Sequence, residues 1–302
     1  MQERYRSYNS YMREIFGEKV YKLSVDGGMT CPNRDGTVGT RGCTFCSGGS
    51  GAFAEFGSDI NAQLDNAKKR VSAKFSGSRY IAYYQSYTNT YAPLDYLKKI
   101  YSPAVSRSDI AGIAIGTRPD CLSGEIIEYI ASINRIKPVF IELGLQTVHP
   151  ATAEAIRRGY PLSVYDDAVR RLGENNINTV VHLILGLPGE TREMMLDSVR
   201  YVAGSGVDGI KLQLLHILKG TDMAEEYYKG RVPVMDMHEY IRLIADCVSI
   251  LPKHIVIHRL TGDGDKRELI APVWSADKKR VLNAMRRYFD EHDIIQGSGL
   301  IL

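Results

Sequence analysis

The chain has 302 residues, of which 44% are hydrophobic and 24% charged, and this balance excludes a disordered polypeptide and a membrane protein. A formal net charge of +3 permits an anionic partner without requiring one, because the sum says nothing about where the basic side chains lie. No apolar run is long enough for a signal peptide or a membrane span, so we expect a cytoplasmic protein.

Short runs rich in β-branched and aromatic residues recur along the chain and are predicted to be strands. Each run is nearly continuous in apolar residues, which is typical of parallel strands covered by helices on both faces. In chain order the runs are Tyr21–Val25, Tyr80–Gln85, Ile110–Gly116, Val139–Leu145, Thr179–Leu185, Gly209–Leu214 and His254–His258. Loops rich in Gly, Pro, Asp or Asn follow them, which indicates a repeated strand–helix unit.

Amphipathic stretches between these strands are predicted to be helices. Four of them open with a residue that favours a helix N-cap: Asp59–Phe75, Ser123–Ile133, Ser163–Glu174 and Thr191–Val202. A further helical face is formed by Tyr240, Ile244, Cys247, Val248 and Leu251. The alternation of strands and helices predicts an α/β fold, a complete or partial (β/α) barrel, with a doubly wound sheet as the alternative.

The two ends of the chain differ in character from its middle. Residues 1–19 interleave Tyr and Arg, residues 20–262 carry the strand–helix units, and residues 263–302 form a C-terminal extension. The extension contains a predicted basic helix over roughly Ala276–His292, with Lys278, Lys279, Arg280, Arg286 and Arg287. No obvious linker separates these parts, so we expect both ends to be extensions of one domain.

Three of the five cysteines lie in the loop after the first predicted strand, where Cys31, Cys43 and Cys46 form a Gly-rich C-x11-C-x2-C arrangement. A reducing cytoplasm disfavours structural disulfides, so clustered thiols are interpreted as metal or cofactor ligands. An iron–sulfur cubane normally takes four thiolates, and three would leave one iron open. The alternative is a structural zinc site with a fourth ligand elsewhere. Cys121 and Cys247 are expected to be buried structural thiols.

Polar or Gly-rich segments follow the next four predicted strands. They are Gln85–Thr90, Gly116–Asp120, Glu142–Gln146 and Gly186–Thr191. Because barrel enzymes place their sites at the carboxyl ends of the strands, we expect these segments and the cysteine loop to surround one site. Singly, each also has a structural explanation: Gly116 and Gly186 as turn residues, Glu190 as a helix cap, and Arg118 with Asp120 as a surface ion pair.

Several of these segments resemble the YhcC/YtqA-type bacterial radical S-adenosylmethionine (SAM) proteins. The resemblance rests on CPNRDGTVGTRGCTFC at residues 31–46, Gly116–Asp120, Glu142–Gln146 and His182–Thr191, and it continues through His258–Gly264 and Ala271–Ser275. Most radical SAM proteins space their cysteines C-x3-C-x2-C, and the longer spacing of this chain agrees with the narrower subgroup. The SAM core of the family is related to the catalytic subunit of Elongator and to coproporphyrinogen oxidase-like enzymes.

The resemblance implies a partial (β/α)6-type TIM-like barrel in which Cys31, Cys43 and Cys46 hold a [4Fe–4S] cluster. SAM would chelate the open iron and be cleaved to a 5′-deoxyadenosyl radical. By position, Gln85–Thr90 would meet the methionyl end of SAM, Glu142 and Gln146 the ribose or the methionyl group, and Ile184–Gly186 the adenine, while His182 would face the substrate. The full set of expected SAM-binding residues is Gln85, Ser86, Asn89, Thr117, Arg118, Asp120, Glu142, Gln146, His182, Ile184, Gly186 and Glu190.

For the substrate, the resemblance implies tRNA. YtqA-type members are identified with MnmL-type modification of the wobble uridine, from the carboxymethylaminomethyl to the aminomethyl form. Basic clusters at Lys68–Arg70, Lys278–Arg280 and Arg286–Arg287 would contact phosphates, although such clusters are also typical of solvated helix faces. A flavodoxin- or ferredoxin-like protein is the expected electron donor. Two alternatives stay open: a radical enzyme that acts on a small molecule or a protein, and a non-catalytic Zn or Fe–S binding module.

Overall fold

The computed structural model describes residues 3–47, 57, 59–73, 75, 77–262 and 264–300. Met1, Asp263 and Leu302, which bound the predicted terminal segments, lie outside the described residues, as does Lys74 in the predicted helix Asp59–Phe75. No helix in the described part of the chain is both long and apolar enough to cross a membrane.

Seven parallel strands form one sheet and stand in it in their order along the chain. They are β1 (Tyr21–Val25), β2 (Tyr80–Tyr84), β3 (Ile110–Thr117), β4 (Val139–Gln146), β5 (Asn178–Leu185), β6 (Gly209–Leu214) and β8 (Val256–Arg259). Each corresponds to a predicted strand, and no end differs from its prediction by more than two residues. The largest difference is at β8, because the amide of Ile255 bonds to the carbonyl of Pro252 in a turn before the strand.

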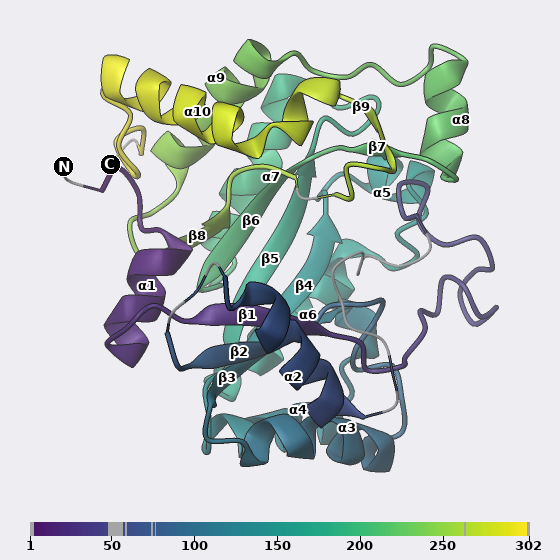
Figure 1. The fold of residues 1–302 in the computed structure, drawn as a ribbon. Coiled ribbons are helices and arrows are strands. Elements are labelled where there is room, and N and C mark those ends of the chain that lie inside the picture. Colours follow the sequence, from purple (N-terminus) through teal and green to yellow (C-terminus); the bar gives the residue numbers. More distant parts are fainter. Residues whose placement is uncertain are drawn as a thin grey trace.

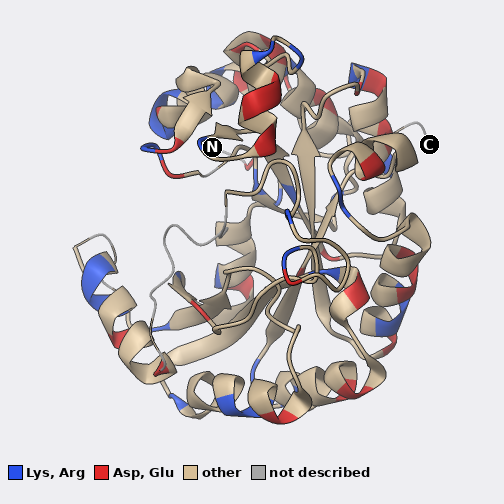
Figure 2. Cartoon of the chain, turned by 90° about the vertical axis from the view of Figure 1, so that its right-hand side faces the viewer, with Lys and Arg blue, Asp and Glu red and all other residues tan. Residues whose placement is uncertain are grey.

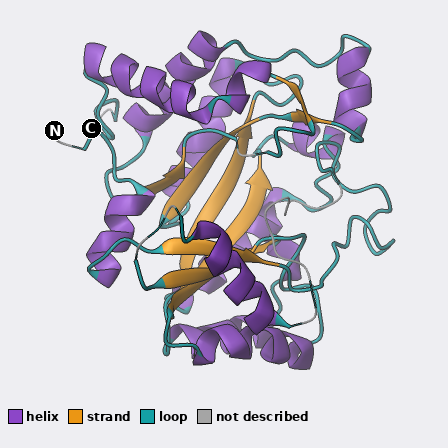
Figure 3. Ribbon diagram, in the orientation of Figure 1, coloured by secondary structure: helices purple, strands orange, loops and turns teal. Residues whose placement is uncertain are grey.

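The sheet curls into a partial barrel, with most helices on its convex side (Figures 1 and 3). In a flat sheet, β1 and β4 would be three strand spacings, about 14 Å, apart. Here Lys22 Nζ of β1 lies 2.6 Å from Glu142 Oε1 of β4, so the curl brings side chains of distant strands together across the concave side. The predicted α/β partial barrel is confirmed, with one strand more than a six-unit barrel.

The helices that follow the strands pack on the convex side and on one another. They are α2 (Ile60–Val71), α3 (Leu94–Ser106), α4 (Gly124–Asn134), α6 (Leu162–Glu174), α7 (Arg192–Gly204), α9 (Met237–Ile250) and α10 (Lys278–Glu291). Two shorter helices are α5 (Pro150–Ala155) and α8 (Asp222–Tyr228), and Met223 and Ala224 of α8 belong to a second apolar cluster, against which Phe45 of the cysteine loop packs. Two short strands, β7 (Ile217–Leu218) and β9 (Leu269–Ala271), pair antiparallel in a second sheet.

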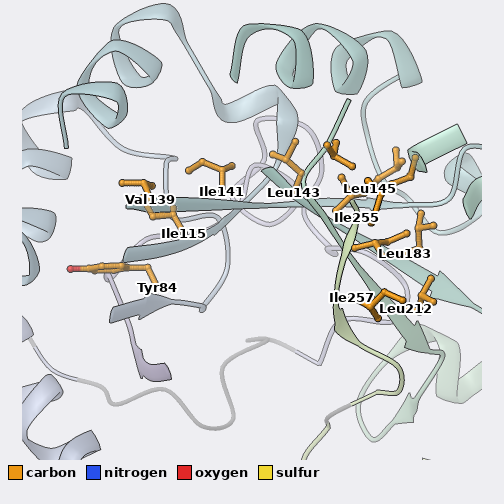
Figure 4. Close-up of a cluster of buried hydrophobic side chains, with 14 of the residues drawn as sticks. Tyr84, Ile115, Val139, Ile141, Leu143, Leu145, Leu183, Leu212, Ile255 and Ile257 are labelled. Carbon is orange, nitrogen blue, oxygen red and sulfur yellow. The ribbon is translucent and has the colours of Figure 1, made fainter. Parts of the chain in front are cut away.

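Successive side chains along each strand face two different environments. On the convex side, Ile141, Leu143, Leu183 and Leu212 join one apolar core beneath the helices (Figure 4). The intervening concave positions carry polar and charged groups, among them Glu142. The expectation of apolar residues on both strand faces is therefore wrong for the carboxyl half of the concave side, because that half lines a cavity.

The predicted helix starts are mostly confirmed. The side chains of Asp59, Ser123 and Thr191 accept hydrogen bonds from the first-turn amides of α2, α4 and α7, as N-caps do. Ser163 is not a cap, because α6 begins one residue earlier, after Pro161, whose restricted φ of −75° suits that position. α2 ends at Val71, before the predicted Phe75.

The N-terminal segment contains a helix that the sequence analysis did not predict, α1 (Tyr8–Phe16). Its Met12 packs with Ile81 and Phe140 near the amino ends of β2 and β4, so α1 covers the concave side at the end opposite the cysteine loop. The two ends of the chain lie side by side (Figure 1), and Gln296 bonds through its amide oxygen to the amide of Arg6 at 2.7 Å.

Candidate functional site

The loop after β1 is folded by its own hydrogen bonds. The amide of Arg34 bonds to the carbonyl of Cys31 at 2.8 Å, and the amide of Cys46 to the carbonyl of Cys43 at 3.0 Å. These turns bring Cys31, Cys43 and Cys46, all free and half-buried, to the wall of a single cavity. Cys121 and Cys247 are buried, as predicted, and do not line it.

The cavity has a volume of about 310 Å³ and opens at the carboxyl ends of the strands. Ten of the fifteen predicted site residues line it: Cys31, Cys43, Cys46, Gln85, Thr117, Arg118, Glu142, Gln146, His182 and Ile184. They come from the cysteine loop and from β2, β3, β4 and β5 or the residues directly after them. The expected gathering of strand ends and cysteine loop around one place is thus seen, and the roles of these residues as SAM contacts stay predictions.

Five predicted residues do not line the cavity: Ser86, Asn89, Asp120, Gly186 and Glu190. Asn89 donates through Nδ2 to the carbonyl oxygens of Tyr84 and Gly116, at 3.0 and 2.9 Å, and so holds two strand ends together. Ser86, which belongs to the same segment, is also buried. Whether any of the five meets SAM stays a prediction.

Of the structural explanations for single residues, the one for Gly186 is confirmed, and those for Glu190 and for Arg118 with Asp120 are wrong. Gly186 has a φ of +90°, which a glycine adopts readily, so its role in a turn is confirmed. Glu190 is not a helix cap, because Thr191 caps α7, and Glu190 instead accepts a bond from Thr147. Arg118 and Asp120 form an ion pair at 2.7 Å that is mostly buried and not a surface pair.

The thiol of Cys43 lies against a buried polar side chain, that of Asn33. Asn33 is buried and donates through Nδ2 to the carbonyl of Arg157 at 2.7 Å and to Cys43 Sγ at 3.4 Å. Burial raises the pKa of Cys43 to about 11, although the Asn33 bond opposes the shift. This thiol therefore stays protonated at neutral pH unless a metal displaces the proton.

The thiols stand apart along the cavity wall. Within the described residues, no group of three or more His, Cys, Asp or Glu side chains gathers closely enough to hold a single metal ion. Arg34 crosses the loop and donates to the carbonyl of Cys46 at 2.8 Å, which fixes the loop's position.

The floor of the cavity carries an ion-pair cluster, in which Glu142 and Lys211 line the cavity and Lys22 pairs with Glu142 from outside the lining. Glu142 is 1% exposed, and its two carboxylate oxygens accept separately from Lys22 and from Lys211. Burial opposes its ionisation, yet the two lysines hold the pKa of Glu142 well below its usual range. Glu142 is therefore a carboxylate whose oxygens already have partners.

His182 completes this cluster as a neutral side chain. The side-chain amide of Gln213 donates through its Nε2 to Nδ1 of His182 at 3.2 Å. The ring proton of His182 is therefore on its own Nε2, which donates to Glu142 Oε2 at 3.1 Å. Burial and the charge of Lys211 lower the pKa of His182 to about 4, in agreement with this tautomer. The predicted role of His182 toward a substrate is compatible with its place on the cavity wall.

Three residues in or beside this cluster were not predicted from the sequence as site residues: Lys22, Lys211 and Gln213. A usable signal was present, because in Gly209–Leu214 the polar Lys211 and Gln213 alternate with Ile210, Leu212 and Leu214. That period of two indicates a strand with one apolar and one polar face.

Comparison with known protein families shows to which family the chain belongs. The model described as "Radical SAM superfamily" matches residues 35–202, more than half of the chain, and the model described as "Radical_SAM C-terminal domain" matches residues 207–291. The chain belongs to the radical SAM superfamily. Members are enzymes, and membership implies binding of a [4Fe–4S] cluster and SAM.

Two relatives narrow the membership to the predicted subgroup. The chain is 42% identical to YtqA of Bacillus subtilis, over 98% of this chain and 92% of that protein. It is 35% identical to YhcC of Escherichia coli, over 94% of this chain and 92% of that protein. The resemblance to the YhcC/YtqA type is thereby confirmed.

More distant relatives share only part of their length with this chain. A tRNA uridine(34) acetyltransferase of Methanocaldococcus jannaschii is 24% identical over 67% of this chain and 36% of its own length. Among solved structures, the archaeal Elp3 of Methanocaldococcus infernus superposes with a TM-score of 0.70 at 16% identity, over 92% of this chain and 64% of that one. The superposition on Elp3 shows that the two chains share a fold.

The residues of this cavity fit the cluster and the cofactor that the family implies. Three thiols suit a cubane with one open iron. The buried Oε1 of Gln146 has no hydrogen-bond partner among the described residues, so a polar ligand is needed to satisfy it. Gly144 makes room there, because a Cβ at this position would lie 2.8 Å from Gln146 Nε2.

Proposed function

We propose that this chain is a radical SAM enzyme that modifies the C5 substituent of the tRNA wobble uridine, from carboxymethylaminomethyl to aminomethyl. The observation that carries the proposal is one cavity with three free thiols in its wall and a charged floor on β4 and β6. When bound, the cluster and SAM would supply a radical able to remove a hydrogen atom from a C–H bond, and the CH2 group between the nitrogen and the carboxylate of this substituent offers one. Return of one further electron to the cluster and hydrolysis of the resulting imine would release the two carbons as glyoxylate and leave the aminomethyl group.

The chain's own residues have separate tasks in this proposal. Cys31, Cys43 and Cys46 hold the cluster, and the amide of Gln146 offers its unsatisfied oxygen to SAM. A flavodoxin- or ferredoxin-like protein is proposed to reduce the cluster.

The choice of tRNA draws its support from relatives and from surface charge. The name of the archaeal relative refers to uridine 34 of tRNA, and an Elongator complex protein 3 of Schizosaccharomyces pombe is 25% identical over 52% of this chain and 29% of its own length. Charged residues lie mostly on the helices and loops around the strands (Figure 2). Both signs occur there, so local clusters and not the net charge favour an anionic partner.

The test of the proposed function is the modification state of tRNA in cells that lack the gene. We expect nucleoside mass spectrometry to find carboxymethylaminomethyluridine accumulated and aminomethyluridine, with anything made from it, depleted. The wild-type gene on a plasmid should restore the profile, and a copy with Cys46→Ala should not. A wobble-uridine profile that does not change on deletion contradicts the proposal.

The basic face of α10 provides a separate test of RNA binding. Val281, Met285 and Phe289 bury the opposite face, and this leaves Lys279, Arg280, Arg286 and Arg287 exposed. A K279A/R280A/R287A variant is expected to bind tRNA about tenfold more weakly, with the slope of log affinity against log salt reduced by about three. Filter binding at several salt concentrations measures both. A K98A/K99A variant on α3 serves as control, and equal effects of the two variants would remove the role of α10.

A further inference from the structure

Among the described residues at the cavity floor, two ammonium groups, those of Lys22 and Lys211, share the single carboxylate of Glu142. Strand register also places Arg259 of β8 beside Lys211 of β6, and its positive charge lowers the pKa of Lys211 further. Buried charges are stable when they are paired, so the shared carboxylate leaves this part of the floor suited to an anion.

Lys211 has a hydrogen-bond donor to spare. An ammonium group has three N–H donors, and those of Lys211 meet Glu142 Oε2 and, at 3.3 Å, the hydroxyl of Tyr83. The third is available to a ligand, because Lys211 lines the cavity while being only 3% exposed.

Gln213 lies two residues further along β6 on the same face and lines the same cavity. One N–H of its amide goes to His182 Nδ1, and the other has no bond to a described residue. The floor therefore presents two N–H donors from neighbouring side chains. Two donors match the two oxygens of one carboxylate, whereas a phosphate group would keep oxygens without partners.

We propose that Lys211, together with Gln213, binds a carboxylate of the substrate at the floor of the cavity. The inference rests on the proposed function, in which the carboxymethyl group of the wobble uridine carries that carboxylate. Lys211 stands three residues before the end of β6, about 10 Å below the mouth of the barrel. A substituent anchored there extends toward the thiols, which places its C–H bonds between the floor and the cluster ligands.

The proposal explains why a buried lysine is tolerated at this position. Burial lowers the pKa of Lys211 to about 7, although its attraction to Glu142 opposes the shift. A bound carboxylate adds a second negative neighbour and stabilises the ammonium form. A neutral substituent in the same place would add no negative partner for the third N–H donor of the ammonium, so the site favours a negative charge.

The experiment compares two synthetic anticodon stem–loop RNAs that differ only at the wobble C5 substituent. One carries carboxymethylaminomethyl and the other its neutral carboxamide. Both are titrated into anaerobically reconstituted protein with SAM and without reductant, so that binding is measured without turnover. We expect wild type to bind the carboxylate RNA at least about tenfold more tightly, and Lys211→Gln to bind both within about twofold.

Lys22 pairs with the same carboxylate but is not among the residues that line the cavity, so its replacement separates the local charge from direct contact with the ligand. Lys22→Met should weaken the preference for the carboxylate RNA less than Lys211→Gln does, because Lys211 keeps its donors, and Lys211→Arg should keep most of the preference. Iron content reports whether each variant holds its cluster. If the Lys211→Gln variant does not hold its cluster, the double variant K211Q/E142Q removes both charges together, and its preference between the two RNAs is measured in the same way.

The outcomes separate the inference from the function on which it rests. A Lys211→Gln protein that keeps the preference for the carboxylate RNA overturns the carboxylate site. Equal binding of both RNAs by wild type, with carboxymethylaminomethyluridine still accumulating in the deletion strain, overturns the site but keeps the function. An unchanged tRNA profile in that strain overturns both.

Discussion

Replacement of Cys46 with alanine is expected to leave the anaerobically reconstituted protein colourless and unable to cleave SAM above background in the presence of dithionite. The physical reason is the size of the ligand set. In the proposed site, three thiolates would hold a cubane with one protein ligand fewer than usual, and two would not retain it. Iron and sulfide analysis, the visible absorption spectrum and 5′-deoxyadenosine formation measure the effect.

Cys121 is the matched control for this substitution. It is a buried thiol whose pKa burial raises to about 12, and it does not line the cavity. Cys121→Ala should therefore keep full iron content and SAM cleavage. A wild-type protein that purifies with zinc and stays colourless after reconstitution would favour the binding-module alternative, and SAM cleavage by the Cys46→Ala protein would remove Cys46 from the ligand set.

The parts of the site that lie close together in sequence could be predicted from it. Cys31, Cys43 and Cys46 share one loop, and the general rule for parallel barrels places that loop beside the ends of the following strands. Gln85, Thr117 and Gln146 were placed at the cavity by the same rule. The rule becomes unreliable further from a strand end, because Ser86 and Asp120 do not line the cavity although Tyr87 and Thr88 do, and periodicity does not encode these loop conformations.

The floor cluster could not be predicted, because its pairs join residues far apart in the chain. Lys22 and Glu142 are separated by 120 positions, and Glu142 and Lys211 by 69. Only the curl of the sheet brings β1, β4 and β6 within reach of one another. Glu142 was predicted to meet the ribose or the methionyl group of SAM, and although it lines the cavity, its oxygens accept from the two lysines and His182. A role toward SAM would require it to give up one of these bonds.

Replacement of Glu142 with glutamine is expected to lower the free energy of unfolding by about 3–5 kcal/mol at pH 7. Glutamine keeps the shape of the side chain but removes the carboxylate that Lys22 and Lys211 share. Lys211 is fully inside the protein, so its charge loses its partner without gaining water. Urea unfolding monitored by circular dichroism, with both proteins in the same cofactor state, gives the difference.

The dependence of this loss on pH follows from two pKa shifts. The folded pKa of Glu142 lies below its unfolded value, so its contribution is complete above about pH 4.3 and is lost only as the pH falls through the folded pKa. The folded pKa of Lys211, about 7, also lies below its unfolded value, so in wild type stability rises with pH between about 7 and 10.4. Without Glu142, Lys211 sheds its proton at still lower pH. The loss is therefore expected to be smaller at pH 9 than at pH 7.

A double variant distinguishes this electrostatic cause from a packing defect. Glu142→Gln combined with Lys211→Met removes the buried pair together, and Lys22, whose side chain is 20% exposed, can then be hydrated. The double variant should recover most of the stability lost by Glu142→Gln alone, since replacing both members of a buried pair costs far less than removing one. Additive losses would instead locate the effect in the fit of the side chains, and a Glu142→Gln protein within about 1 kcal/mol of wild type at pH 7 would show that the carboxylate does not balance the lysines.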